Sequence, residues 1–259
     1  MNLANVSHTA IYTLLCRAVE TANENPTIHD PMATFSLEKL LSIVSKEEQK
    51  RIQKLKKRVA GIGANDTKRI AKRTNEIDKM VNDFISNNPS CTVINLACGF
   101  DTRFWRIENE KCKYIEIDLP EVVALKKEIL KDQLSYELIG YSVLDPTWID
   151  QVTTNGNSGF LLVAEGLIMY LPEPDALKLF QDISQGFHHS QFILEMIPER
   201  YTKGFKHKIL TWTLRLLMGM NISFVFGVQD PYQIESYGDG FKVIDVKGHM
   251  PYIVNVAIN

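Results

Sequence analysis

Apolar residues recur every three or four positions through the first 90 residues, the period of helices with one buried face. This pattern predicts helices over roughly residues 11–22, 33–44, 46–58 and 67–86. From residue 91 the apolar residues instead form short unbroken runs, as in strands that are buried on both faces of a parallel sheet. The runs predict strands at 91–97, 114–117, 136–139, 160–164 and 191–197.

Helix-sized segments separate these five strands, so the sequence predicts an α/β fold with a doubly wound, Rossmann-like sheet. Two more apolar runs, 241–246 and 253–258, are joined by only six residues. So short a link favours antiparallel pairing, because a parallel crossover needs a dozen residues or more. We therefore expect seven strands with the last one antiparallel.

No repeat or low-complexity linker divides the chain, and we predict a single domain over 1–259. Within it we expect a helical N-terminal cap (1–90), a ligand-binding core (91–197), a lid insertion (198–237) and a terminal strand pair (238–259). The lid segment departs from the strand-helix alternation and contains Trp212, Phe224 and Phe226.

Charge and composition narrow the classes of partner that the protein can have. The 259 residues contain 29 Lys plus Arg against 31 Asp plus Glu, which argues against a nucleic-acid partner. A basic run, 46–58, is interpreted as the solvated face of an amphipathic helix, with a polyanion-binding helix as the alternative. The longest apolar stretch, 209–227, contains Arg215, so we expect no membrane span.

The four cysteines form no paired motif, and they favour free thiols in a reducing cytoplasm with no metal site. We see no N-terminal secretion signal, and we expect a cytoplasmic protein.

Ligands of open α/β sheets bind beyond the carboxyl ends of the strands, and polar residues there are the candidates. The first strand ends in Ala97, Cys98 and Gly99, small residues that let a backbone approach a ligand closely. Asp118 ends the second strand, 19 residues beyond Gly99. A carboxylate at that place suits a ribose diol, although it also suits the cap of the helix that begins at Pro120.

Two more carboxylates follow the next strands. Asp145 is a candidate acceptor for an adenine amine, or the cap of a helix that starts at Pro146. Glu165 directly follows a buried apolar strand, where a charge needs a partner. That partner is either an arginine or a cofactor at the switch point of the sheet.

Several segments together resemble the leucine carboxyl methyltransferase family, which is S-adenosylmethionine-dependent and includes bacterial polyketide O-methyltransferases. The matching segments lie between residues 8 and 200 and follow the family's order. They are Cys16–Arg17–Ala18, His29–Asp30–Pro31–Met32–Ala33, the helix segment around Arg73 with Asp78, NLACGFDTR at 95–103, YIEIDLP at 114–120 and AEGLIMYLP at 164–172. The chain departs from the family where Ala97 replaces the turn's first glycine and Cys98 its middle small residue.

The resemblance implies S-adenosylmethionine as cofactor and assigns roles to single residues. Arg73, with Arg17 nearby, is expected at the methionine carboxylate, since a guanidinium binds a carboxylate bidentately. Glu165 is expected at the methionine end, Asp118 at the ribose and Asp145 or its neighbours at the adenine. Ala97, Gly99 and Leu119 complete the expected cofactor set, and Asp101 is expected to orient the turn or to pair with Arg103.

We therefore predict an O-methyltransferase that acts on a carboxylate or hydroxyl of a small molecule. Tyr170 is the candidate catalytic residue at the acceptor, and it is also a candidate for packing. Methylation of a phenol would need a base, for which His188 and His189 are further candidates. The alternatives are methylation of a protein's C-terminal carboxylate, an NAD-dependent oxidoreductase, or a binding module without turnover. The acceptor and the oligomeric state stay open.

Overall fold

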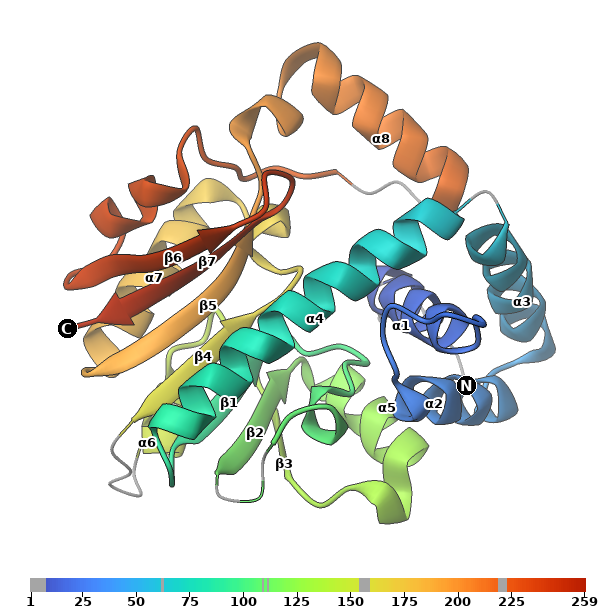
Figure 1. Cartoon of the computed structure of the whole chain (residues 1–259), viewed down its shortest axis with the longest axis horizontal. Helices are drawn as coiled ribbons and strands as arrows, with labels where there is room; N and C mark the ends of the chain where they lie inside the picture. Colours follow the sequence, from blue (N-terminus) through green and yellow to red (C-terminus); the bar gives the residue numbers. More distant parts are fainter. Residues whose placement is uncertain (1–7, 62, 109, 111, 154–158, 219–222) are drawn as a thin grey trace.

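The computed structural model describes residues 8–61, 63–108, 110, 112–153, 159–218 and 223–259. Its centre is a seven-stranded sheet with the order β3-β2-β1-β4-β5-β7-β6 (Figure 1). The strands are β1 (Thr92–Leu96), β2 (Lys113–Asp118), β3 (Glu137–Gly140), β4 (Phe160–Ala164), β5 (Ser190–Met196), β6 (Phe241–Lys247) and β7 (Tyr252–Ile258). Each begins and ends within one residue of its predicted position, so the predicted fold class is confirmed.

The strand order reverses between β1 and β4, which both run parallel to their neighbours. This reversal is the switch point at which open α/β sheets bind ligands. β7 lies antiparallel between β5 and β6, with Ile193 opposite Asn255 and Val243 opposite Val256. The predicted antiparallel last strand is confirmed.

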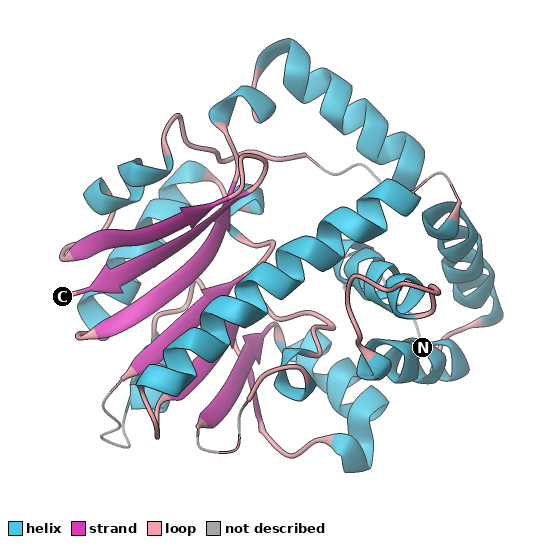
Figure 2. Ribbon diagram, in the orientation of Figure 1, coloured by secondary structure: helices cyan, strands magenta, loops and turns pink. Residues whose placement is uncertain are grey.

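Eight α-helices lie around the sheet among the described residues (Figure 2). They are α1 (His8–Thr21), α2 (Pro31–Ile43), α3 (Lys46–Ala60), α4 (Ala64–Asn87), α5 (Pro120–Leu130), α6 (Thr147–Thr153), α7 (Glu173–Gly186) and α8 (Gly204–Met218). Asp30 caps α2 by accepting a hydrogen bond from the backbone N–H of Ala33, and Ser45 caps α3 by accepting one from that of Glu48.

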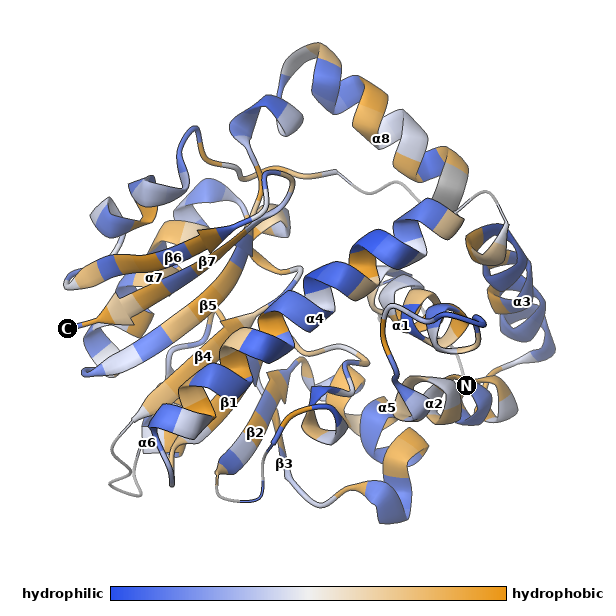
Figure 3. Ribbon diagram, viewed as in Figure 1, coloured by the Kyte–Doolittle hydropathy of each residue, from blue (hydrophilic) through white to orange (hydrophobic). Residues whose placement is uncertain are grey.

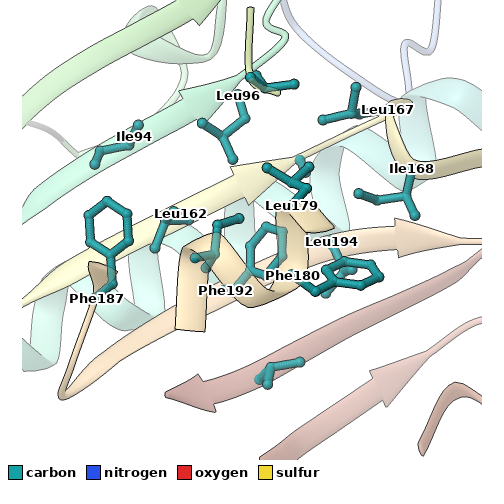
Figure 4. Packing of buried hydrophobic residues seen from close by; sticks show 14 of the residues in the cluster. Ile94, Leu96, Leu162, Leu167, Ile168, Leu179, Phe180, Phe187, Phe192 and Leu194 are labelled. Carbon is teal, nitrogen blue, oxygen red and sulfur yellow. The ribbon is translucent and has the colours of Figure 1, made fainter. Parts of the chain in front are cut away.

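The larger apolar core lies between the sheet and helices α6 and α7. Phe180 of α7 and Phe187, which directly follows this helix, pack with Ile94, Leu162 and Phe192 of the strands, all nearly inaccessible to solvent (Figure 4). The alternation of side chains along each strand sends their neighbours to the opposite face. That alternation fills both sides of the sheet.

Helix α4 crosses the opposite face of the sheet (Figure 1). Its buried side includes Ile77, Val81 and Phe84, which pack against Val93 and Leu161. The helices α1, α2 and α3 form a separate apolar cluster with α5 beside it. Helix α4 therefore connects the N-terminal helices to the sheet.

The helix-sized segment expected after β1 is not an α-helix. Between Ala97 and Lys113 the described residues form only a short 3-10 helix, η1 (Arg103–Trp105). Arg103 and Arg106 turn their side chains inward to buried carboxylates, which a regular amphipathic helix with a polar outer face would not do. Helix α4 covers the sheet face near β1 instead.

The segment 198–237 contains α8 and two short 3-10 helices, η4 (Glu199–Tyr201) and η5 (Pro231–Ser236). Apolar and polar residues alternate along α8 (Figure 3), which leaves Phe205 and Trp212 exposed. Residues 219–222, inside the apolar stretch at 209–227, lie outside the described residues. In the part of the chain that the structure describes, no helix is both long and apolar enough to cross a bilayer.

Candidate functional site

A cavity of about 1320 Å³ opens at the carboxyl ends of the parallel strands. One wall is the sheet edge, with residues that follow β1, β2, β3 and β4, and the other wall belongs to α1, α3 and the short helix η3 (Ile168–Tyr170). Single ligand pockets typically measure about 300–1000 Å³. The cavity is therefore large enough for a nucleoside cofactor and a second molecule.

The turn after β1 lies at the sheet edge of this cavity. Ala97 adopts a left-handed backbone conformation with φ +50°, which is unfavourable for a residue with a Cβ atom. Gly99 has φ +51°, and a Cβ atom there would lie 2.9 Å from the Cβ atom of Ala10 on α1. Cys98 between them is buried, and this burial raises the pKa of its thiol well above the ordinary range.

Asp118 at the end of β2 is fixed against this turn. Its two carboxylate oxygens accept the backbone N–H groups of Gly99 at 2.6 Å and of Leu119 at 2.7 Å. Burial raises the pKa of Asp118, and these two hydrogen bonds oppose the rise. Each oxygen keeps a free lone pair toward the cavity, so the carboxylate can accept ribose hydroxyls. Neighbouring Leu119 is 41% exposed and also lines the cavity.

Glu165 follows β4 and meets Arg73 of α4. Arg73 donates from Nε at 3.0 Å and from Nη2 at 2.6 Å to the same Glu165 oxygen. Arg103 donates to the second oxygen, and Thr74 also donates to the first. Burial alone would raise the pKa of Glu165, but Arg73 and Arg103 outweigh it and lower this pKa to about 2. The sequence offered two partners for Glu165, an arginine or a ligand at the switch point. In the structure Glu165 pairs with arginines and also lines the cavity.

Four arginines and five carboxylates, buried or largely buried, form one network at the back of the cavity. Arg106 contacts Asp30, Asp78 and Asp101, and the other members are joined through shared carboxylates. The full set is Arg17, Arg73, Arg103 and Arg106 with Asp30, Asp78, Asp101, Glu165 and Glu195. The set formally holds five carboxylates against four guanidinium groups, and burial raises the pKa of one of the carboxylates, Glu195.

Arg17 and Asp101 have defined places in this network. Arg17 donates to Asp30 at 3.1 Å and to the carbonyl of Phe100 at 2.7 Å, while its side chain reaches the cavity. Asp101 pairs with Arg103 at 2.8 Å, as the sequence predicted. Burial opposes ionisation of Asp101, but Arg103 and Arg106 hold its pKa well below the usual range.

Asp145 lies outside this site. It is exposed, and its carboxylate accepts from the backbone N–H and the hydroxyl of Thr147 at the start of α6. Of the two alternatives for Asp145, the structure therefore shows the helix cap. The cavity wall after β3 is formed instead by Tyr141, Ser142, Val143 and Leu144.

Tyr170 of η3 lies at the opposite wall. Its ring centroid is 5.4 Å from that of Phe224, in the segment 198–237, and it borders the cavity. Burial and then nearby Glu195 raise the pKa of the Tyr170 phenol, so the hydroxyl stays protonated near pH 7. His188 and His189 precede β5 and so lie at the edge of the sheet away from the cavity.

Glu195 of the network, and a nearby ion pair between Lys126 and Glu116, were not predicted from the sequence. Glu195 of β5 pairs with Arg73 at 3.1 Å and accepts from the backbone N–H of Gly166 at 2.8 Å. Lys126 of α5 pairs with Glu116 at 2.6 Å and donates to the carbonyl of Asp101. Glu195 could have been found in the sequence, because it is a charged residue inside the apolar run 191–197. The sequence around Lys126 gives no comparable sign that this lysine is buried.

Relatives resemble the chain in sequence and in fold. It is 26% identical over 249 residues to a tetracenomycin polyketide synthesis O-methyltransferase of Streptomyces glaucescens, covering 93% of this chain and 82% of the relative. It is also 26% identical to leucine carboxyl methyltransferase 1 of Caenorhabditis elegans, over 47% of this chain and 46% of the relative.

Among solved structures, the fold matches PH0226 of Pyrococcus horikoshii OT3 with a TM-score of 0.54 and 12% identity, covering 73% of this chain and 90% of that one. It matches the magnesium protoporphyrin IX methyltransferase of Synechocystis PCC 6803, solved with bound S-adenosylhomocysteine, with a TM-score of 0.52 and 13% identity, covering 83% and 95%.

The chain is an S-adenosylmethionine-dependent methyltransferase. The sequence profile described as leucine carboxyl methyltransferase matches residues 10–184. The chain belongs to this family, and S-adenosylmethionine is its cofactor, so the NAD alternative is set aside.

Proposed function

We propose that the protein transfers a methyl group from S-adenosylmethionine to a carboxylate oxygen of a small molecule. The observation that carries this proposal is the two-walled cavity, with buried carboxylates at the sheet edge and space for an acceptor toward α1, α3 and η3. The match to the polyketide O-methyltransferase over 93% of the chain supports a small-molecule acceptor.

In this proposal the residues at the sheet edge hold the cofactor. Asp118 accepts the ribose hydroxyls, and Leu119 packs beside the base together with the wall at 141–144. Glu165 and Arg73 meet the charged groups of the methionine end, with Arg17 nearby. Ala97 and Gly99 form the turn that the cofactor approaches.

The chemistry needs positioning more than proton transfer. When bound, S-adenosylmethionine supplies a methyl carbon on a positively charged sulfur: the acceptor's carboxylate oxygen forms a bond to that carbon, the carbon–sulfur bond breaks toward sulfur, and a methyl ester and S-adenosylhomocysteine result. No proton is released, because a carboxylate is already ionised near pH 7. Holding the reactants in line supplies about 7–11 kcal/mol of the barrier reduction.

We assign the residues 198–237 to the outer cover of the acceptor. Ser223 lines the cavity, and Phe224 packs on Tyr170. The backbone N–H of Val225 donates to the carbonyl of Met169 at 2.9 Å, which attaches the segment to η3. Excluding water there strengthens the electrostatic interactions inside the cavity.

A second candidate is methylation of a phenolic hydroxyl, for which His8 gives specific support. His8 lines the cavity, and burial, followed by the charge of Arg51, lowers the pKa of its imidazole. A neutral imidazole near pH 7 can accept the proton of a phenol. The variant His8→Gln would slow a phenol at least tenfold and leave a carboxylic acid unaffected.

The experiment begins with calorimetric titration of S-adenosylmethionine, S-adenosylhomocysteine and NAD. We expect micromolar binding of the first two and none of NAD. Transfer of labelled methyl to small carboxylic acids, phenols and a peptide ending in leucine then separates the acceptors. Transfer to the peptide alone would overturn the small-molecule proposal, and binding of NAD alone would overturn the cofactor assignment.

A further inference from the structure

The acceptor wall of the cavity is basic. Arg51, Lys54 and Arg58 of α3 all line it. Their spacing of three and four residues places them on one side of the helix. Ile52 and Val59 are buried, and Leu55 packs on the clusters formed with α1 and α4. The basic run 46–58 is thus a helix in which some cations face the cavity and others face solvent.

All the lining carboxylates of the cavity lie at one side, where Arg17 and Arg73 also line it. Its lining carboxylates are Asp101, Asp118 and Glu165, all at the sheet edge. Each already accepts hydrogen bonds from arginines or from backbone N–H groups. On the wall of α3, the described lining residues include no carboxylate. The charged groups that an anion meets on the α3 wall are therefore cations, beside the apolar Ile52 and Leu55.

Lys54 and Arg58 have no ionic partner within the described residues. Arg51 pairs with Glu48 at 3.2 Å, whereas no carboxylate lies within 4.0 Å of the side-chain nitrogens of the other two. Lys57 and Arg58 both lie in the last turn of α3, where a helix C-terminus favours cations, but of these two only Arg58 lines the cavity. Lys46, Lys50 and Lys56 also lie off the cavity.

We propose that Lys54 and Arg58 bind a second acidic group of the acceptor. This inference rests on the proposed function and names its substrate class: a small molecule with two acidic groups, one methylated near the sheet edge and one held at α3. The held group keeps its charge throughout. A diacid would therefore leave as its monomethyl ester, with the second carboxylate unreacted.

The test compares matched acids on the full chain. Suberate and octanoate share eight carbons, and terephthalate and benzoate share a ring, so each pair differs by one carboxylate. We measure their binding by calorimetry with and without saturating S-adenosylhomocysteine. Two partly exposed ion pairs predict a preference of about three- to thirtyfold for the diacid, and the preference should shrink in 0.5 M salt.

Two double variants with equal charge loss separate the proposal from general electrostatics. Lys54→Gln/Arg58→Gln should abolish the diacid preference. Lys50→Gln/Lys57→Gln, on the same helix but off the cavity, should retain the preference. No diacid preference in the wild type, its survival in Lys54→Gln/Arg58→Gln, or its equal loss in both variants would each overturn the proposal.

The cofactor titration distinguishes failure of the proposed function from failure of the second-anion site at α3. If S-adenosylhomocysteine fails to bind, the proposed function fails, while the diacid preference of the cofactor-free protein still decides on the α3 site. If the cofactor binds and mono- and diacids bind alike, only the second-anion inference fails. For any diacid that reacts, mass spectrometry should show the monomethyl ester, and a dimethyl ester formed at the same rate would contradict it.

Discussion

Arg73 and Glu165 are separated by 92 residues, yet two guanidinium nitrogens of Arg73 donate to one Glu165 oxygen. This contact joins α4 to the end of β4 at the switch point of the sheet. The side chains of Arg73 and Glu165 are only 15% and 10% exposed, so water solvates neither charge well. Each charge is stabilised mainly by the other. The pair therefore contributes to the lining of the cavity and to the stability of the fold together.

Replacing Glu165→Gln should destabilise the protein by about 3 kcal/mol, because it leaves Arg73 and Arg103 partly unpaired in a buried place. Urea unfolding measures the change. Asp182→Asn is the matched control, since its pair with Lys178 is a surface contact and should contribute under about 1 kcal/mol. Equal effects of the two substitutions would contradict the importance of burial.

The same residue predicts a pH dependence. The pKa of Glu165 is about 2 in the folded protein, below its value of 4.5 in a model peptide. A lowered folded pKa contributes stability that is fully present above the unfolded value and is lost as the pH falls from about 5 toward 2. The difference in unfolding free energy between wild type and Glu165→Gln should therefore shrink over this range. A constant difference would show that the charge of Glu165 is not its source.

Asp118→Ala should weaken S-adenosylmethionine binding by at least about a hundredfold, since two hydrogen bonds to a charged group contribute about 1.5–3 kcal/mol each. Asp118→Asn tests the same contact with nearly the same side-chain size. Asp145→Ala is the control, because that residue caps α6 outside the cavity, and its cofactor affinity should equal the wild type. Unchanged affinity in both Asp118 variants would remove this residue from the ribose site.

Ala97→Gly should stabilise the fold by about 0.5–1 kcal/mol. Glycine removes the cost of φ +50° for a residue with a Cβ atom, about 1–2 kcal/mol, while its greater freedom in the unfolded chain returns part of that gain. Ala71→Gly, in the buried interior of α4, should instead destabilise by about 1 kcal/mol. Thermal unfolding of both variants gives the comparison, and destabilisation by Ala97→Gly would show that the turn is not strained.

The sheet was predictable because its signal is local. Buried strands such as 160–164 are unbroken apolar runs, and short links decide which strands run antiparallel. The segment after β1 was mispredicted because Arg103 and Arg106 look solvent-facing in sequence, while their partners Asp78 and Asp30 lie far away along the chain. Long-range ion pairs leave little trace in periodicity.

The site residues divide in the same way. The place of Asp118 and Glu165 at the cavity was predictable because they lie at the ends of strands, and strand ends are visible in the sequence. The cavity-facing side of α3 was not predicted, because solvated cations and cations that face a cavity have the same spacing. Only the packing of Ile52 and Val59 fixes which side turns inward.

Helix α4 carries Arg73 and Asp78 toward the cofactor side and Val81 and Phe84 into the sheet core. Substitutions that change the tilt of this helix would disturb both the ion pairs of Arg73 and Asp78 and the packing of Val81 and Phe84. We therefore expect few such substitutions to be tolerated. The wall that we propose for the acceptor is made by other elements, α1, α3 and η3. On this proposal, new acceptor preferences can evolve, or be engineered, by exchanging residues there while the residues at the sheet edge stay intact.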